Sequence, residues 1–148
     1  MNEVLKTLPP VTLDQVLGLV RYVAAYGGVV DSSRLDDLLD INMDLLPHVV
    51  DAAVSLRLLR AEGGNLIITP EGRKAIELSG RDLRALIKSL SDDVRPFKDI
   101  FEAIGDSDTI SGQLLRNILR RAGYVNIEGA VMIFTEWLAY MGITVLEE

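Results

Sequence analysis

The segment 58–76 limits the folds open to this chain more than any other segment does. Short apolar runs at 58–59 and 66–68 flank the turn sequence Glu-Gly-Gly-Asn at 62–65, and Thr69-Pro70-Glu71 follows at once. Glycine supplies the positive φ of a tight turn, so the two runs are predicted to pair as antiparallel strands. Threonine caps helices well, and proline suits the first helical position. The segment therefore predicts a two-stranded hairpin that leads directly into a helix.

Two helices are predicted near the start of the chain. Pro9-Pro10 are expected to end a mobile N-terminus, and Thr12 can cap the first helix, whose apolar residues recur at helical spacing until Gly27-Gly28. Side-chain oxygens at 31–33 (Asp-Ser-Ser) can cap a short second helix. The apolar residues of that second helix are Leu35, Leu38 and Leu39.

A third helix is predicted between the second helix and the hairpin. Asn42 or Asp44 can cap it, and Pro47 falls in its first turn, where a missing N–H costs little. Its inward residues are expected to be Leu46, Val49, Val50, Ala53 and Val54. Three helices followed by a two-stranded wing are typical of a winged helix-turn-helix. We therefore predict a winged-helix domain over residues 12–78.

Residues 79–148 are predicted to form a second, wholly helical module that packs on the first. Apolar stripes indicate helices near 81–90, 94–104, 111–122 and 127–141, and residues 143–146 can form a short terminal strand. The module is tri-helical and resembles a winged helix in its helix-helix-helix-strand order, which leaves an internal repeat open. The last helix is expected to bury one side, made of Ala130, Ile133, Phe134, Trp137, Leu138 and Met141. The predicted fold class is mainly α.

Composition indicates a soluble protein with an interface. Apolar residues make up 49% of the chain, more than a small domain buries, so we expect a subunit contact, as in a homodimer, to which Tyr22 and Tyr26 could contribute. No apolar run is long enough to cross a bilayer and no signal peptide is evident, so a cytoplasmic location is expected. The absence of cysteine excludes disulfides and thiolate sites. Few Asn and Gln residues would suit a thermophile.

The search for catalytic motifs predicts no enzyme and no cofactor. Neither a phosphate-binding Gly-Lys-Ser/Thr loop nor a GxGxxG turn is present, and His48 is the only histidine. Asp106 and Asp108 resemble the start of a calcium loop, but the later positions lack the required ligands, so helix capping is the better interpretation. Neighbouring carboxylates such as Asp92-Asp93 are interpreted as solvated surface, and the aromatic group around Trp137 as core. No metal site is predicted.

The third helix carries the residues that decide between DNA and protein as the partner. Its exposed stripe is expected to contain Asp44, His48, Asp51, Ala52 and Ser55, of which Asp44, His48, Asp51 and Ser55 form the candidate interaction face. Carboxylates in this position would repel the phosphates of DNA, and the net charge of −7 also disfavours DNA binding.

Basic residues elsewhere leave a second interpretation open. They lie on the connecting helices and near the C-terminus, and would form a basic patch if nucleic acid were bound: Arg73, Lys74, Arg81, Arg84, Lys88, Arg116, Arg120 and Arg121. Mixed charge is normal on exposed helices, so solubility and ion pairing are the simpler explanation.

Three segments resemble the C-terminal AAA-associated domain family: TLDQVLGLVRYV at 12–23, TPEGRKAI at 69–76 and TEWLAYMG at 135–142. In that family the domain resembles a winged helix and follows the ATPase of some nitrate- and sulfonate-type ABC transporters, and it also occurs as a stand-alone archaeal protein. The resemblance implies a protein partner, either a separate transporter ATPase or another copy of the chain. It does not imply ATP hydrolysis, because no ATPase motif is present.

Two functions remain from the sequence. The first is a non-catalytic, regulatory or protein-interaction module of the winged-helix type. The alternative is a DNA-binding transcription regulator that uses the wing and the basic helices.

Overall fold

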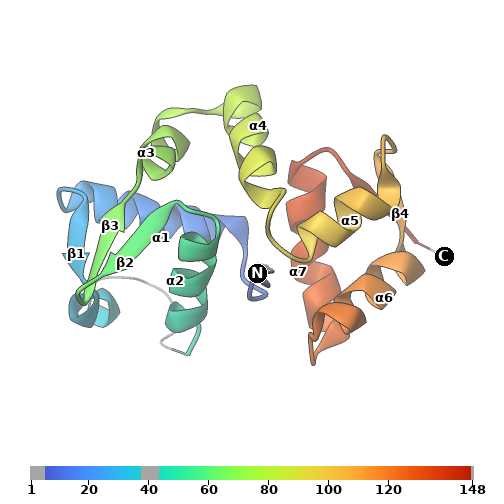
Figure 1. Ribbon diagram of the computed structural model, residues 1–148, viewed down its shortest axis with the longest axis horizontal. Helices are drawn as coiled ribbons and strands as arrows, with labels where there is room; N and C mark the ends of the chain where they lie inside the picture. The colour runs from blue at the N-terminus through green and yellow to red at the C-terminus, as the bar shows by residue number, and fades with distance from the viewer. Residues whose placement is uncertain (1–5, 38–43, 148) are drawn as a thin grey trace, which may run out of the picture.

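The computed structural model describes residues 6–37 and 44–147, which are mainly helical and include a small antiparallel sheet. The first half contains α1 (Leu13–Ala25), β1 (Val29–Asp31), the 3-10 helix η1 (Ser32–Asp37), α2 (Leu46–Ser55), β2 (Leu59–Glu62), β3 (Asn65–Ile68) and α3 (Pro70–Glu77). The second half contains α4 (Gly80–Ser91), α5 (Phe97–Ile104), β4 (Thr109–Ser111), α6 (Gly112–Ala122), α7 (Ile127–Tyr140) and β5 (Thr144–Leu146). Figure 1 shows α1–α3 and the sheet on one side, α5–α7 on the other, and α4 between them.

The predicted hairpin is confirmed. β2 and β3 pair antiparallel, with Leu59 opposite Ile68 at the open end. Gly63 and Gly64 form the turn with φ of 59° and 82°. Two consecutive residues with positive φ match a tight hairpin turn, which explains why glycine occupies both positions.

The sheet has a third strand, which was not predicted, beside the two strands of the predicted hairpin. β1 pairs antiparallel with β3, placing Val29 opposite Ile67 and Asp31 opposite Asn65, and the strand order is β1-β3-β2. A strand of three residues is too short to show the alternation that identifies strands in a sequence. β1 therefore forms one outer edge of the sheet and β2 the other.

The helix α3 is packed closely on the start of the hairpin. The Thr69 hydroxyl accepts a hydrogen bond from the Gly72 N–H at 2.9 Å and donates to the Arg57 carbonyl oxygen at 2.6 Å, close to the Leu58 carbonyl oxygen, which is 3.0 Å away. A Cβ atom at Gly72 would lie 2.2 Å from that same oxygen. The close approach requires glycine, and it holds the predicted helix start at Thr69-Pro70 against the hairpin.

The second predicted helix is a 3-10 helix. η1 follows β1 directly, and Leu35 is buried as expected. The Asp31 carboxylate accepts a hydrogen bond from the Ser33 N–H at 3.0 Å, in agreement with the predicted capping role of this cluster. Leu38 and Leu39 lie outside the described residues.

The cap of α2 differs from the prediction. Leu45, rather than Asp44, occupies the N-cap position and makes no side-chain cap hydrogen bond, while Asn42 lies outside the described residues. Pro47 sits in the first turn as predicted, where proline needs no hydrogen-bond partner. Of the predicted inward residues, Val49 and Ala53 are buried, and the half-buried ones are Leu46, Val50 and Val54.

The second half follows its predicted helix pattern. β5 lies within the predicted terminal strand and pairs in parallel with β4, a strand that was not predicted, so the second half is not wholly helical. Phe97 contacts both Phe134 and Trp137, with ring centroids 5.6 and 5.4 Å apart. These aromatic rings are fully buried, so the interpretation of the Trp137 group as core is confirmed. The predicted buried side of α7 is also confirmed, except that Ile133 is half-buried.

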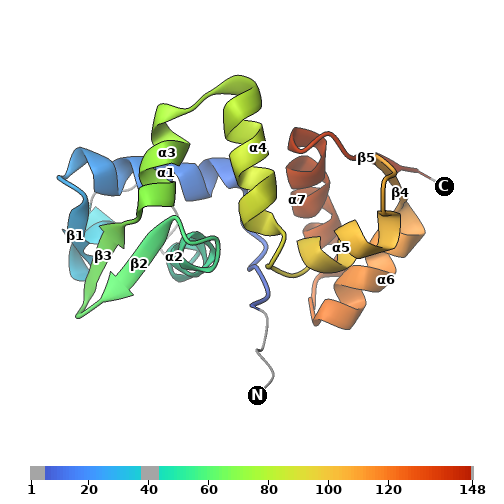
Figure 2. The ribbon, with the colours of Figure 1, turned by 45° about the horizontal axis from the view of Figure 1, so that its top comes forward.

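The segment before α1 is packed against the second half, which corrects the expectation of a mobile N-terminus up to Pro10. The Leu8 N–H donates to the Arg95 carbonyl at 2.7 Å, and the Arg95 N–H donates to the Lys6 carbonyl at 2.8 Å. Trp137 Nε1–H donates to the Val11 carbonyl at 2.7 Å, and the Tyr124 hydroxyl donates to the Leu8 carbonyl. Figure 2 shows this segment beside the C-terminal end of α4. Residues 6–11 thus tie the start of the chain to α5–α7.

Candidate interaction surfaces

The outer side of α2 presents the acidic surface that the sequence predicted. Asp44, His48 and Asp51 are all exposed, the first just before the helix and the others one turn apart on it. The opposite side of α2 packs on α1, and its last turn leads into β2. Two carboxylates and one imidazole therefore form the α2 face, which we define as Asp44, His48 and Asp51.

Two residues predicted on this stripe are buried. Ala52 has no exposed surface and Ser55 is 9% exposed, so Ser55 does not belong to the candidate face. The Ser55 hydroxyl has no hydrogen-bond partner among the described residues. Helical spacing places Ser55 in line with His48, yet Ser55 is buried. Beyond the end of α2, Arg57 forms an ion pair with Asp93, which follows α4, at 3.5 Å.

The basic residues of α3 and α4 are exposed as predicted, and two of them contact other elements. The Arg84 guanidinium lies over the Tyr140 ring, 5.9 Å from its centroid, and so joins α4 to α7. The Arg73 guanidinium packs over Gly28, where a Cβ atom would lie 2.7 Å from its Nη2. The remaining exposed members of this group are Lys74, Arg81 and Lys88.

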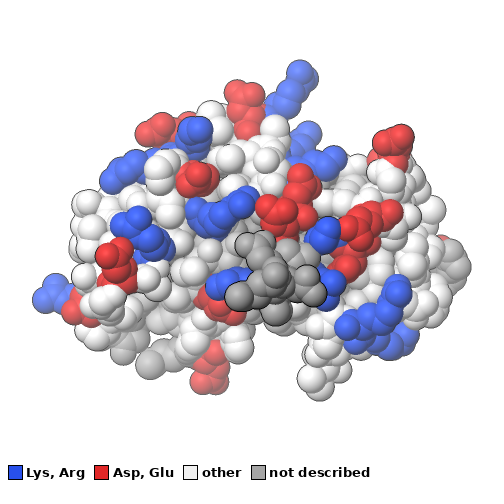
Figure 3. All heavy atoms as spheres, in the orientation of Figure 1, with Lys and Arg blue, Asp and Glu red and all other residues white. Residues whose placement is uncertain are grey.

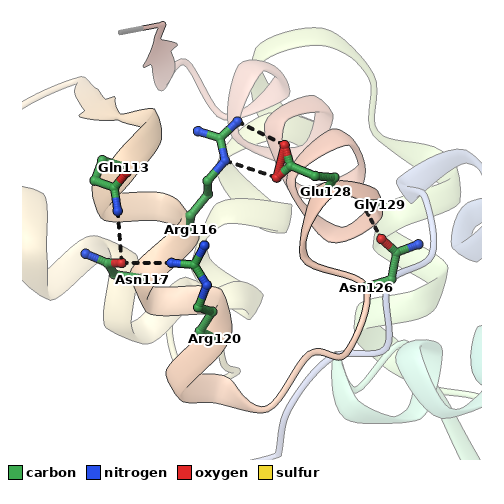
Figure 4. A network of polar contacts seen from close by, with 7 residues as sticks. All are labelled: Gln113, Arg116, Asn117, Arg120, Asn126, Glu128 and Gly129. Carbon is green, nitrogen blue, oxygen red and sulfur yellow. Dashed lines mark hydrogen bonds and ion pairs between the residues drawn. The ribbon is translucent and has the colours of Figure 1, made fainter.

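The basic residues of α6 belong to a network of polar contacts (Figure 4). Arg116 binds both carboxylate oxygens of Glu128, at 3.0 and 3.2 Å, which joins α6 to the start of α7. This ion pair raises the pKa of Arg116 and lowers the pKa of Glu128, in each case chiefly through the hydrogen bond. The Asn117 side-chain oxygen accepts from Arg120 at 3.1 Å, and Arg121 approaches the Asn117 carbonyl at 3.5 Å. Intramolecular partners therefore engage all three arginines.

The structure does not bring the predicted basic residues together. α3 and α6 lie in opposite halves of the molecule in both ribbon views (Figures 1 and 2). Over the face seen in Figure 3, Lys and Arg side chains alternate with Asp and Glu side chains. A continuous cationic track, which phosphate binding requires, is not formed on that face.

The cavities between the described elements were not predicted from the sequence, and two of them are lined by charged or aromatic side chains. The first, of about 440 Å³, lies between α5 and α6 and is lined by Arg95, Asp99, Glu102, Ala103, Ile118, Arg121 and Ala122. Its charges are largely balanced, because Arg95 pairs with Asp99 at 3.5 Å and Glu102 with Lys98 at 2.6 Å. The spacing of four residues in both pairs is the only trace of this site in the sequence.

The second cavity, of about 340 Å³, lies along β1. It is lined by Tyr22, Tyr26, Val29, Val30, Asp31 and Arg34. Tyr22 and Tyr26 lie side by side with ring centroids 4.7 Å apart. Tyr26 and Val29 remain 56% and 50% exposed, so an apolar patch forms at the end of α1 and the start of β1.

Neither a metal cluster nor a membrane span is found in residues 6–37 and 44–147. No group of three or more His, Cys, Asp or Glu side chains there could hold a metal ion. In the same residues, no helix combines the length and the apolar composition needed to cross a membrane.

Comparison with known proteins identifies the family. No curated protein and no solved structure matches the chain. A family model, the C-terminal AAA-associated domain, matches residues 33–147. The matched range includes the TPEGRKAI and TEWLAYMG segments but not the segment at 12–23. Since the match covers most of the sequence, the chain belongs to the C-terminal AAA-associated domain family.

Proposed function

We propose that this protein is a non-catalytic interaction module that binds a separate ABC-type transporter ATPase through the α2 face. The family carries the proposal, because its members are associated with ATPases. Asp44, His48 and Asp51 are all exposed, the last two one turn apart on α2. A surface with two carboxylates suits a basic partner surface, because complementary charge speeds encounter and fixes orientation.

The proposal includes a winged-helix fold for residues 12–78. α1, η1 and α2 supply three helices, and the sheet of β1, β3 and β2 supplies the hairpin that would be the wing. In a winged helix that reads DNA, the third helix enters the major groove. Here the third helix is α2, which is acidic on its open side.

We further propose that residues 79–148 contain a second unit of the same plan without a wing. Helix, strand, helix, helix and strand follow one another as α1-β1-η1-α2-β2 and again as α5-β4-α6-α7-β5. β1 and β2 are both antiparallel to β3 and therefore run in the same direction, as β4 and β5 do.

The turn after the third helix is a further likeness between the units, and α1 ends in the same type of turn before β1. After α2 and after α7, three successive N–H groups donate to carbonyls four, three and five residues earlier, at 2.8–3.1 Å. The middle residue of each turn, Arg57 or Gly142, has positive φ (63° and 88°). The next residue, Leu58 or Ile143, is buried. This pattern is a Schellman cap followed by a strand, repeated in both halves.

The two-unit arrangement weighs against DNA binding. The arginines at 116, 120 and 121 lie on α6, which corresponds to the second helix and not to the third, reading helix. On α7, which corresponds to the third helix, the exposed residues include Glu128, Met132 and Glu136. Neither third helix therefore offers cations to phosphates.

The test is a binding measurement with the ATPase subunit of a nitrate- or sulfonate-type transporter, prepared without a C-terminal domain of its own. We expect Asp51→Lys to weaken binding about tenfold or more, because it places a cation against a basic surface. Glu136→Lys is the matched control. It makes the same charge change at an exposed position of α7 and should leave the affinity for the ATPase unchanged.

Two results would contradict the proposal. Equal effects of Asp51→Lys and Glu136→Lys would show that the α2 face is not the contact. Failure of the ATPase to bind, together with binding of mixed DNA that falls steeply as salt rises, would favour a transcription regulator.

A further inference from the structure

The two edges of the first sheet differ in chemistry. On β2, the exposed Arg60 and Glu62 form an ion pair at 3.1 Å, and charged residues of this kind discourage strand pairing. On β1, the exposed side chains are Val29 and Asp31, and Tyr26 lines the same cavity as Val29. The β1 edge is therefore uncharged at its start, around Tyr26 and Val29, and carries its charge at its end, at Asp31.

The main chain of β1 directs hydrogen-bonding groups away from β3, toward the outer side of the sheet. The Ile68 N–H donates to the Gly28 carbonyl at 2.9 Å, and the Ser32 N–H donates to the Gly64 carbonyl at 3.0 Å. In an antiparallel ladder, alternate residues bond to the same neighbour, so Gly28, Val30 and Ser32 face β3. The N–H and C=O groups of Val29 and Asp31 consequently point away from β3.

The cavity of about 340 Å³ lies along this same edge. It is bordered by Tyr26 near the start of β1 and by Arg34 beyond its end. Asp31, between them, is held ionised because the Ser33 N–H and hydroxyl bind its carboxylate and lower its pKa. The edge thus carries an aromatic ring, an anion and a cation in sequence.

We propose that the β1 edge is the interface with a second copy of this chain, joined in antiparallel pairing about a twofold axis at Val30. This register places Val29 opposite Asp31 of the second copy, and the reverse, so the outward groups form four main-chain hydrogen bonds. It also brings Tyr26 of each copy toward Arg34 of the other, an arrangement that favours a cation–π contact.

The charges along the β1 edge favour a second copy of this chain as the partner. A twofold axis sets the start of one strand beside the end of the other, so the side of Asp31 and Arg34 meets the uncharged side of Tyr26 and Val29. Asp31 lies diagonal to Asp31 of the second copy rather than opposite it. The interaction goes beyond the proposed function, since it involves β1 and not α2.

The experiment measures the oligomeric state by sedimentation equilibrium over a range of concentrations. A short edge supports a moderate affinity, so we expect a dimer with Kd of ~10 µM. Val29→Lys should raise Kd about tenfold or more, because a lysine at the edge opposes pairing. Val125→Lys is the matched control, since Val125 is 98% exposed on the α6–α7 connection, and its Kd should equal that of the original chain.

Hydrogen exchange identifies the edge independently of any substitution. The amides of Val29 and Asp31 should exchange more slowly as protein concentration rises, while the amides of β2 should not change. Circular dichroism checks that both variants keep their helical content. A chain that stays monomeric, a dimer equally weakened by both substitutions, or a dimer unaffected by Val29→Lys would overturn the proposal. Each outcome is independent of whether the ATPase binds.

Discussion

Replacing Gly72 with alanine tests how tightly α3 is held against the hairpin. The new Cβ would lie 2.2 Å from the Leu58 carbonyl oxygen and 2.8 Å from Ile68 Cγ1. Ordinary contact distances are above 3 Å, so the helix or the hairpin must move by about 1 Å. The Leu58 oxygen also accepts from the Thr69 N–H at 3.2 Å, and that bond would be disturbed by the movement.

The expected loss of stability follows from two opposing effects. Overpacking typically costs about 1–3 kcal/mol, whereas alanine is favoured over glycine within a helix by up to ~1 kcal/mol. We expect the first to prevail at Gly72, because the obstructing atom belongs to the main chain and cannot rotate away. The predicted net change in the free energy of unfolding is a loss of about 1–2 kcal/mol.

Gly18→Ala is the control for the helix preference. Gly18 lies inside α1, and nothing comes within 4 Å of the position that its Cβ would take. This substitution should therefore stabilise the protein by up to ~1 kcal/mol. Urea unfolding followed by far-UV circular dichroism measures both variants. If Gly72→Ala stabilised the protein as much as Gly18→Ala, α3 would not be in close contact with the Leu58 carbonyl.

Three further predictions concern single contacts. Trp137→Phe should lower the free energy of unfolding by about 2–4 kcal/mol, because it leaves the Val11 carbonyl without its donor and opens a cavity. A urea titration measures this loss. An unchanged free energy would show that Trp137 does not hold the N-terminal segment. Thr12→Ala removes the capping box of α1 and should cost about 1 kcal/mol, seen as a lower Tm, whereas Thr12→Ser should retain most of it. In a carbon NMR pH series, the pKa of Glu128 should lie below its ordinary value of 4.5, because Arg116 binds its carboxylate, and should return toward that value in Arg116→Gln. Since its folded pKa is lowered, its contribution to stability is present above pH 4.5 and is lost as the pH falls through the folded pKa.

Local signals predicted the parts of the fold that depend on neighbouring residues. The hairpin follows from Gly63-Gly64, whose positive φ angles need no distant contact. The start of α3 follows from Thr69-Pro70, and the start of α1 from Thr12, which shares a capping box with Gln15. In each case the decisive groups are within four residues of one another, so the sequence pattern contains the whole interaction.

The parts that were missed depend on contacts between distant segments. β1 becomes a strand only because β3, more than thirty residues later, offers its main chain. The segment at 6–11 is fixed by Arg95, Tyr124 and Trp137, and no periodicity in Lys-Thr-Leu-Pro-Pro-Val indicates those partners. Ser55 has the helical spacing of the exposed stripe, yet its side chain is buried, which spacing within one helix does not indicate. The predicted exposure was accordingly right for Asp44, His48 and Asp51 and wrong for Ser55, while a role of these residues in binding stays a prediction.

The two proposed surfaces are compatible in one assembly. β1 and β2 are opposite edges of the sheet, and α2 contacts β2 and α1, whereas the proposed twofold axis lies at β1. Pairing through β1 therefore leaves the α2 face of both copies open, one on each side of the axis. A dimer of this kind would present two acidic faces to two partner subunits, so binding at one face would raise the effective concentration at the other. Val29→Lys would then weaken apparent binding to a surface carrying several ATPase subunits, but not to one subunit in solution, whereas Asp51→Lys would weaken both.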